Sequence, residues 1–503
     1  VLPALPALER YRFACAFYPT LEQAAAQTLV AAPGVRIEIV DGLLKVSARH
    51  QLLCEQRVQL RRWHHLQLDS GDGRVRLRLR SHSRGPGEHG IEETLESDFE
   101  MPTEAGDWIL ADRTFNGRIE NPAITTADDV IGAWDFSLDM ATDIVRDTSP
   151  HARHGRLHQT PTRAVKGTLW DGTTERWTDA PEQYAAIHFH DDDLTDAGWE
   201  TDFKWRVPAT LPSGLYALRL ETTDSESEDY LPFVVRAKSA RERAQVAYLA
   251  STATYLAYAN ETMSLTGKPA RDPNARYLLE HPEVGYSLYD YHRDGSGVHY
   301  SSRRRPVLNL KPKTLTWSFN ADTNVTAWLE ETGIGFDVVT DEDLHREGAQ
   351  ALAGYRAVIT GAHPEYYSTA MLDGLESWIA EGGRLMYLGG NGFYWRIAYA
   401  PSDPAIIEVR RAEGGTRAWM AEPGEYYHAF TGEYGGMWRR LGRPPNIVAG
   451  IGFAAQGFDG GTYYRLKPGA ADTRVAFIFD GIDIEDDGII GNYGTQANGA
   501  AGE

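Results

Sequence analysis

Side chains that can do acid–base or metal chemistry follow two consecutive strand-like runs in the middle of the chain. His363 and Glu365 come directly after the apolar run 357–360, and Asn391 follows the next such run and a pair of glycines. A short apolar run that stops at a glycine predicts a buried parallel strand, and 371–380 between the two runs has apolar residues at helical spacing. Because open α/β sheets bind ligands at the carboxyl ends of their strands, we expect these side chains to share one edge of a sheet.

Tyrosines are the second group of candidates. Tyr258 lies on a short helix predicted after the strand 245–250, and a long irregular insertion, 262–313, carries several more tyrosines. Phenol and carboxylate oxygens are hard donors that suit a hard, highly charged metal. A trivalent metal could supply the fall of about three units that a tyrosine pKa of about 10 needs to reach neutrality. Most of the 25 tyrosines are nevertheless expected to be packing aromatics.

Several familiar catalytic patterns are missing from the sequence. It has no Cys/His zinc spacing, no Gly-x-Ser-x-Gly elbow, no phosphate-binding loop and no dinucleotide fingerprint. From the residues alone, the pair His363 and Glu365 can be an acid–base pair, a surface ion pair or a relic of a glutamine-amidotransferase-like fold. No cysteine follows these strands, which excludes the thiol chemistry of that fold.

Composition sets the broad class. A chain of 503 residues with 42% hydrophobic content predicts two to four globular domains. The net charge of −21 argues against nucleic acid or an anionic membrane as the main partner. We find no apolar run of about 20 residues and no signal-peptide pattern, so no membrane span is expected. The only two cysteines, Cys15 and Cys54, are expected to be free buried thiols, and a cytoplasmic location is the default.

Three domains are predicted. Residues 1–126 alternate short strand-like runs with turns and are interpreted as a lectin-like (laminin-G or concanavalin-like) β-sandwich; the arginines alternating along 74–80 predict one solvated face. Residues 127–240 are a β-rich, immunoglobulin-like linker region, and 241–503 alternate strands and helices as in an α/β domain. The run 473–485, TRVAFIFDGIDIE, is a further strand candidate. Both ends of the chain look like cuts, so we expect truncation at the N-terminus of the sandwich and at the C-terminus of the α/β domain.

The adjacent histidines His64 and His65 are a weaker candidate site. Neighbouring residues on a strand point to opposite faces, so the pair is interpreted as part of a surface strand and not as a metal site. Sugar binding is a weak alternative for the neighbouring arginines.

Four long phrases resemble one known family. They are YLASTATYLAYANE, SLYDYHRDGSGVHYSSRRRP, TGAHPEYYS and GGNGFYW, and the order of the predicted domains matches as well. Together they are similar to the large (beta) subunit of N,N-dimethylformamidase, over most of 110–503. The resemblance implies a glutamine-amidotransferase-like α/β catalytic domain and a mononuclear Fe(III) held by Tyr258, Tyr289 and Glu365.

The same resemblance assigns further roles. His363 or Glu503 would move the proton to the departing amine, and Asn391 would donate a hydrogen bond to the oxyanion. Phe393 and Trp395 would form walls of a small apolar substrate pocket. The implied reaction is hydrolysis of N,N-dimethylformamide, or a related small N-substituted formamide, to formate and an amine by Lewis-acid activation of carbonyl and water.

The resemblance also implies an oligomer, with or without a small accessory subunit. Two alternatives stay open: a catalytically inactive carbohydrate-binding or structural relative, and a hydrolase of another small amide. The presence of bound iron distinguishes the enzyme from an inactive relative. Substrate profiling distinguishes a formamide hydrolase from a hydrolase of another small amide.

Overall fold

The structure is a computed structural model of the whole chain. It describes residues 1–22, 25–83, 90–224, 227–239, 242–262, 273–314, 318–412, 418–453, 464–482, 484 and 488–490. Glu503, expected near the site, lies outside the described residues.

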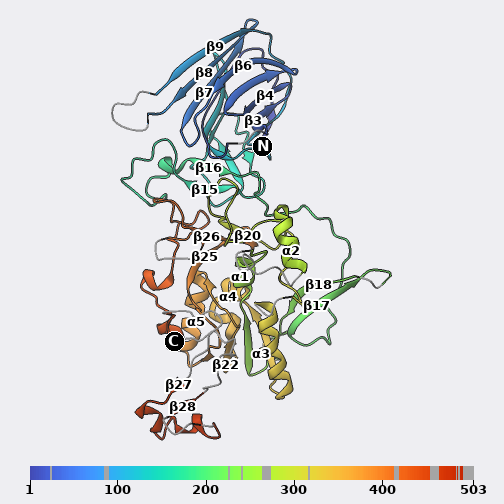
Figure 1. Cartoon of the computed structure of the whole chain (residues 1–503), viewed down its shortest axis with the longest axis vertical. Helices are drawn as coiled ribbons and strands as arrows, with labels where there is room; N and C mark the ends of the chain where they lie inside the picture. The colour runs from blue at the N-terminus through green and yellow to red at the C-terminus, as the bar shows by residue number, and fades with distance from the viewer. Residues whose placement is uncertain are drawn as a thin grey trace.

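Two antiparallel sheets form the N-terminal part, drawn in blue and cyan in Figure 1. The first has, in spatial order, β1 (Leu2–Leu5), β10 (Gly106–Leu110), β3 (Gln27–Ala32), β4 (Val35–Val40), β5 (Leu43–Ala48) and β6 (Gln51–Arg57). The second runs β14 (Gly155–Arg156), β13 (Ile144–Asp147), β12 (Val130–Asp135), β11 (Gly117–Thr125), β2 (Tyr11–Pro19), β7 (His64–Gly71), β8 (Arg74–Ser81) and β9 (Glu92–Asp98). In addition, β16 (Ala186–Phe189) pairs with β11 and with β15 (Thr162–Val165).

One hydrophobic core lies between these sheets. It combines side chains from both, such as Phe13 and Leu77 of the second sheet with Ile37 and Leu44 of the first. The β-rich N-terminal part expected from the sequence is therefore confirmed, and its lectin-like class stays a prediction. Hydrogen bonds join strands on both sides of residue 126 in the second sheet, so sheet pairing does not mark the predicted domain boundary there.

The arginine-rich strand β8 has the expected alternation. Val75, Leu77 and Leu79 are buried, while Arg76 pairs with Glu96 on β9 at 2.6 Å. Both cysteines are free and buried. Burial raises the pKa of each thiol above its usual value, which makes the thiolate scarce at neutral pH.

A two-stranded hairpin follows the sandwich. Strand β17 (Gly214–Glu221) pairs along its whole length with β18 (Glu228–Val235). Ser213 next to it donates its hydroxyl to Val235 and accepts from the backbone N–H of Val338. These bonds attach the hairpin to β21 (Phe336–Thr340), which is an edge strand of the C-terminal parallel sheet. The immunoglobulin-like class predicted for this region stays a prediction.

A parallel four-stranded sheet forms the centre of the C-terminal part. Its order is β21 (Phe336–Thr340), β19 (Val246–Ala250), β22 (Ala357–Thr360) and β24 (Arg384–Met386). The helices that alternate with these strands along the chain are α1 (Thr252–Ala257), α2 (Pro273–Glu280), α3 (Phe319–Glu331), α4 (Asp341–Glu347) and α5 (Thr369–Ala380). The strands 245–250 and 357–360 and the helix 371–380 are confirmed. The assignment to the glutamine-amidotransferase class stays a prediction.

The C-terminal part contains a second four-stranded sheet. It contains β20 (Tyr300–Ser302), β26 (Asp403–Val409), β25 (Trp395–Ala400) and β23 (Tyr366–Tyr367), in that order. Further along the chain are α6 (Asn446–Ala449) and a small pair of strands, β27 (Tyr464–Arg465) and β28 (Ile489–Ile490). The short 3-10 helices are η1 (Pro181–Tyr184), η3 (Pro282–Val284), η4 (Gly348–Leu352), η5 (Trp438–Leu441), η6 (Pro468–Ala471) and η7 (Ala476–Phe479).

The strand predicted within 473–485 is wrong for the described residues 473–482. The structure has the 3-10 helix η7 there, and the backbone N–H of Ile478 bonds to Val475 three residues back. Phe477 is 66% exposed, and the run satisfies part of its backbone locally. Among the described residues, no helix is long and apolar enough to cross a membrane.

Candidate functional site

Most of the candidate residues lie just after the carboxyl ends of three neighbouring parallel strands. Strand β19 leads into α1, whose C-terminal cap is Tyr258. Strand β22 ends just before the loop with His363 and Glu365, and β24 ends before Asn391. Because β22 and β24 are parallel neighbours, their loops meet at one edge, as the sequence predicted.

Three hard oxygen donors converge at this edge. The hydroxyl of Tyr258 donates to Glu365 Oε2 at 2.7 Å, and the hydroxyl of Tyr289 donates to that of Tyr258 at 2.5 Å. Tyr289 Oη also lies 3.3 Å from each Glu365 oxygen. The two phenol rings stack with centroids 4.3 Å apart. Tyr289 reaches the cluster from the long insertion, which supports a functional role for that loop.

The cluster is electrostatically unfavourable for phenolates when no cation is present. Burial, followed by the charge of Glu365, raises the pKa of Tyr258 and of Tyr289 well above the usual value. Both hydroxyls therefore keep their protons and donate them in hydrogen bonds, as the geometry shows. A cation at this point would reverse that preference.

His363 and Asn391 flank the carboxylate. His363 Nε2 lies 3.3 Å from Glu365 Oε2 and 2.5 Å from Asn391 Oδ1. Asn391 has a positive φ of 23°, and Phe393 one of 52°, in the same tight loop. Backbone strain of this kind is common where a loop is shaped for a site. The structure therefore brings five of the predicted residues together.

Two further members of the cluster were not predicted from the sequence. Tyr366 donates its hydroxyl to Tyr289 Oη at 2.6 Å, and Arg411 donates Nη2 to Tyr366 Oη at 2.8 Å. The Arg411 guanidinium also lies 4.5 Å from the ring centre of Tyr289. Adjacency to Glu365 could have suggested Tyr366, but nothing near Arg411 in the sequence points to this site.

Buried groups around the loop fix the position of Glu365. Its backbone N–H donates to the hydroxyl of Thr254 on α1 at 3.1 Å. Asp322 at the start of α3 accepts from the backbone N–H of Ala362 at 2.6 Å and from the hydroxyl of Tyr255. A side chain at Gly361 would lie 2.6 Å from Ser251 Oγ, so the loop needs a glycine there.

The two predicted pocket walls are both buried. Phe393 packs edge-on against Tyr367, with ring centroids 4.8 Å apart. Trp395 opens β25 and lies under the Arg411 guanidinium at 4.8 Å. Both belong to the same core as Tyr289, and their contact with substrate stays a prediction. Glu503 cannot be placed, because it lies outside the described residues.

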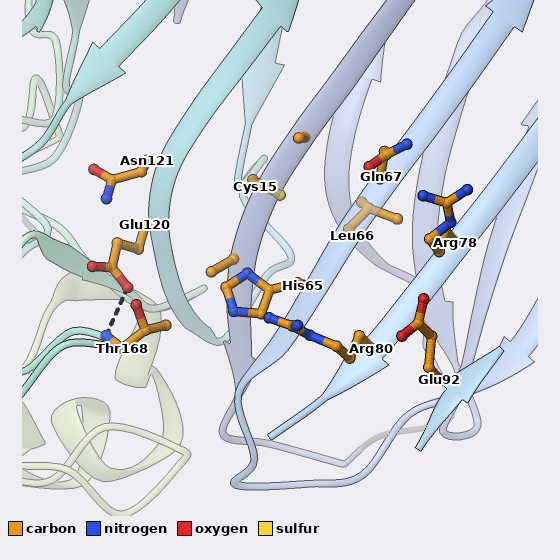
Figure 2. A pocket seen from close by; sticks show the side chains of 12 residues that line it. Cys15, His65, Leu66, Gln67, Arg78, Arg80, Glu92, Glu120, Asn121 and Thr168 are labelled. Carbon is orange, nitrogen blue, oxygen red and sulfur yellow. Dashed lines mark hydrogen bonds between the residues drawn. The ribbon is translucent and has the colours of Figure 1, made fainter. Parts of the chain in front are cut away.

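A separate groove of about 410 Å³ lies on the second N-terminal sheet. Figure 2 shows His65, Arg80 and Glu120 around it, and no residue of the tyrosine cluster is among its lining residues. His64 and His65 point to opposite faces, as predicted. His64 is nevertheless buried against Phe17 in the core, so the interpretation of a surface strand holds for His65 alone.

The donor set fits an iron ion. Two phenol oxygens and one carboxylate lie within 3.3 Å of one another, which is close to the separation of neighbouring ligands around an ion of this size. All three donors are hard and become anionic once deprotonated, as a trivalent cation requires. The nearby Arg411 opposes the raised pKa of Tyr289, which favours the phenolate form.

Comparison with known proteins gives consistent results. The chain is 40% identical over 389 residues to the N,N-dimethylformamidase beta subunit of Alcaligenes sp., covering 73% of this chain and 50% of that protein. It is 38% identical over 433 residues to the N,N-dimethylformamidase beta subunit of Paracoccus aminophilus, covering 78% of this chain and 56% of the relative. The chain thus spans about half the length of the curated relatives it matches.

A solved structure also matches part of the chain. Domain 4 of AbnA, a GH43 extracellular arabinanase from Geobacillus stearothermophilus in complex with arabinotriose, is 17% identical with a TM-score of 0.15. The match covers 26% of this chain and 66% of that one, and at this score it supports no statement about the fold.

A family model described as "N,N-dimethylformamidase beta subunit-like, C-terminal" matches residues 162–502. This span contains Tyr258, Tyr289 and Glu365 together with the parallel sheet that positions them. By these sequence comparisons, the chain belongs to the N,N-dimethylformamidase beta subunit-like family.

Proposed function

We propose that this chain is the catalytic subunit of an amide hydrolase that cleaves N,N-dimethylformamide or a related small N-substituted formamide to formate and an amine. The observation that carries the proposal is the convergence of Tyr258, Tyr289 and Glu365 at the carboxyl edge of the parallel sheet. The names of the two curated relatives support the substrate class.

The proposed cofactor is a mononuclear Fe(III). Tyr258, Tyr289 and Glu365 would hold it, because they are the three hard donors that meet at one point. Iron bound there would act as a Lewis acid on the formyl oxygen and would lower the pKa of a water molecule. Three anionic protein ligands balance the charge of a ferric ion and leave coordination positions for small ligands.

His363 is the residue proposed to move the proton. Its Nε2 atom faces both Glu365 and Asn391, so it lies beside the metal-binding carboxylate without belonging to the three donors. A departing amine needs a proton, and an imidazole can both accept and donate one. In this arrangement Glu365 and Asn391 hold the ring in place.

Asn391 is proposed to bind the substrate oxygen as negative charge develops on it. Its Oδ1 atom accepts from His363 Nε2, which directs the amide N–H groups of Asn391 elsewhere. A fixed amide donor can contribute stabilisation to an oxyanion because it needs no reorganisation during the reaction. Phe393 and Trp395 are buried beside the cluster and would exclude bulk water.

The active enzyme is proposed to contain more than this chain. Both curated relatives are named beta subunits, which implies an assembly of different subunits. We therefore expect an oligomer, with or without a small accessory subunit. A small amide is the expected ligand, and the net charge of −21 disfavours nucleic acid.

The test is formate release from N,N-dimethylformamide by the purified, iron-loaded protein. Wild type is expected to release formate and dimethylamine in equal amounts, and Glu365→Gln is expected to lose at least about 99% of that rate. Glu283→Gln is the matched control, because the Glu283 side chain is 69% exposed in η3 and pairs with His281. Equal rates in wild type and Glu365→Gln would refute the assigned site.

An inactive carbohydrate-binding relative is the second candidate. The groove on the second N-terminal sheet supplies the observation in its favour, since polar side chains such as Gln67, Arg78 and Asn121 line it. That candidate predicts a protein that binds oligosaccharides and holds no iron. A third candidate, hydrolysis of a different small amide, predicts iron together with turnover of another substrate.

A further inference from the structure

A cluster of buried histidines and aspartates lies apart from the tyrosine cluster and has no role in the reaction proposed above. His188 and His190 come from the end of β16 and the residues just after it, and Asp294 comes from the insertion. In Figure 1, β16 lies between the N-terminal sheets and the strands β20 and β26. The cluster therefore joins two regions that are about a hundred residues apart in sequence.

Three ligand atoms meet at one point in this cluster. Asp294 Oδ2 lies 2.9 Å from His188 Nε2 and 3.9 Å from His190 Nε2. Ligand atoms about 2.0–2.1 Å from one zinc ion in a tetrahedron lie roughly 3.3 Å apart, between these two values. The three side chains are at most 6% exposed, so an ion held there would be shielded from solvent.

The surroundings match those of histidine ligands in metal sites. Asp193 lies 3.2 Å from Nδ1 of His190, the ring nitrogen on the side away from Asp294. Ser296 donates its hydroxyl to the second oxygen of Asp294 at 2.5 Å, and its backbone N–H does the same at 2.9 Å. Outer carboxylates and donors of this kind orient ligands and fix the tautomer of the ring.

We propose that His188, His190 and Asp294 form a second metal site, which takes a borderline divalent cation of the zinc class. Two imidazoles and one carboxylate are the donors such ions prefer, in contrast to the phenolate-rich site proposed for Fe(III). Because the three ligands are shielded from solvent, we assign the ion a structural role. The ion fixes the insertion against β16 only five residues after Tyr289, and so holds that tyrosine's loop in place.

The experiment measures zinc in the full-length protein after any affinity tag has been removed. The protein is stripped with a chelator and dialysed against Zn²⁺, and the bound metal is quantified. Wild type is expected to retain about one zinc per chain. Glu365→Gln is expected to retain the same amount, because Glu365 is not a ligand of this site. His188→Gln and Asp294→Asn are expected to lose it, and Asp193→Asn is expected to bind it about 10–100-fold more weakly.

His151→Gln is the matched control, because His151 also pairs with an aspartate but is about one third exposed. X-ray absorption at the zinc edge of the wild-type protein is the second measurement, and it does not depend on whether the variants fold. Scattering from two imidazole rings supports the site. The proposal is overturned by a wild type without stoichiometric zinc, by a zinc signal without imidazole, or by full zinc binding in His188→Gln.

Discussion

At the scale of single residues, the cluster is a chain of hydrogen bonds with a cation at one end and an anion at the other. Arg411 donates to Tyr366, Tyr366 to Tyr289, and Tyr289 to Tyr258, which donates to Glu365. Each phenol is thus held in place by the group before it. This arrangement positions the two tyrosines among the three proposed iron ligands before any metal arrives.

Iron binding is expected to release protons. The pKa values of Tyr258 and Tyr289 are raised by burial and by Glu365, so both phenols are protonated in the metal-free protein at neutral pH. Since the bound form needs phenolates, iron affinity rises with pH and falls as the solution is acidified. Proton release on loading can be followed with an indicator dye, and Tyr289→Phe should release one proton fewer. Loading that is independent of pH from about pH 6 to about pH 9 would contradict this assignment.

Arg411 is expected to act as a positioning residue for Tyr289. Its charge opposes the raised pKa of that phenol, so Arg411→Met should shift the pH at which iron loads upward by about one unit, equivalent to about 1.4 kcal/mol. Arg411→Lys keeps the charge and should load near the wild-type pH. If both variants load like wild type, the guanidinium does not influence the phenol.

At the scale of elements, the site depends on close packing between the end of β22 and its neighbours. Gly361 ends the strand, and a Cβ there would lie 2.6 Å from Ser251 Oγ and 2.8 Å from Asp322 Oδ2. The loop that follows carries His363 and Glu365, so any shift of Gly361 moves both.

Gly361→Ala is expected to lower the iron content strongly while the protein remains folded at a cost of about 1–3 kcal/mol. Gly335→Ala is the matched control, because a Cβ at Gly335 meets no atom within 4 Å. Iron per chain and the thermal midpoint measure the two effects separately. Normal iron content in Gly361→Ala would show that the loop tolerates the displacement.

Local sequence patterns were sufficient to predict the buried parallel strands. The strands at 245–250 and 357–360 were clear, because short apolar runs ending at polar or glycine residues are typical of buried parallel strands. The run 473–485 has the same apolar character, but its residues 476–479 form η7, so apolar character alone did not distinguish a strand from a 3-10 helix. Ser251 directly precedes α1 and has a residue type common at helix N-caps, yet its side chain makes no capping hydrogen bond.

The candidate site was predictable only in part. Three strand ends gave Tyr258, the loop with Glu365, and Asn391, whereas Tyr289 came from the family resemblance. Arg411 and Tyr366 reach the cluster through tertiary packing, which no sequence spacing encodes.

At the scale of the whole molecule, a buried ion pair connects the N-terminal sheets to the C-terminal part. Arg118 on β11 lies 2.6 Å from Glu425, and both side chains are at most 7% exposed. Glu425 also accepts from the backbone N–H of Lys166. This long-range contact had no signal in the sequence, because its partners lie 307 residues apart.

Removal of one partner should be costly. Arg118→Ala leaves the Glu425 carboxylate buried without its guanidinium, and such a loss costs about 3–5 kcal/mol. Arg176→Ala is the control, because Arg176 and its partner Asp179 are more than half exposed at 3.7 Å and such pairs contribute about 0–1 kcal/mol. Thermal unfolding should show a midpoint several degrees lower for Arg118→Ala only. Equal midpoints would mean that the two parts are held together by other contacts.

The most direct test of the proposed metal centre combines iron analysis with a visible spectrum of the purified protein. Wild type is expected to contain about one iron per chain and to show a tyrosinate-to-iron charge-transfer band. Tyr289→Phe should lose the band, while Tyr286→Phe, which changes a half-buried tyrosine of the same loop, should keep it. A colourless protein that stays free of iron after iron is supplied, or an unchanged band in Tyr289→Phe, would contradict the assignment.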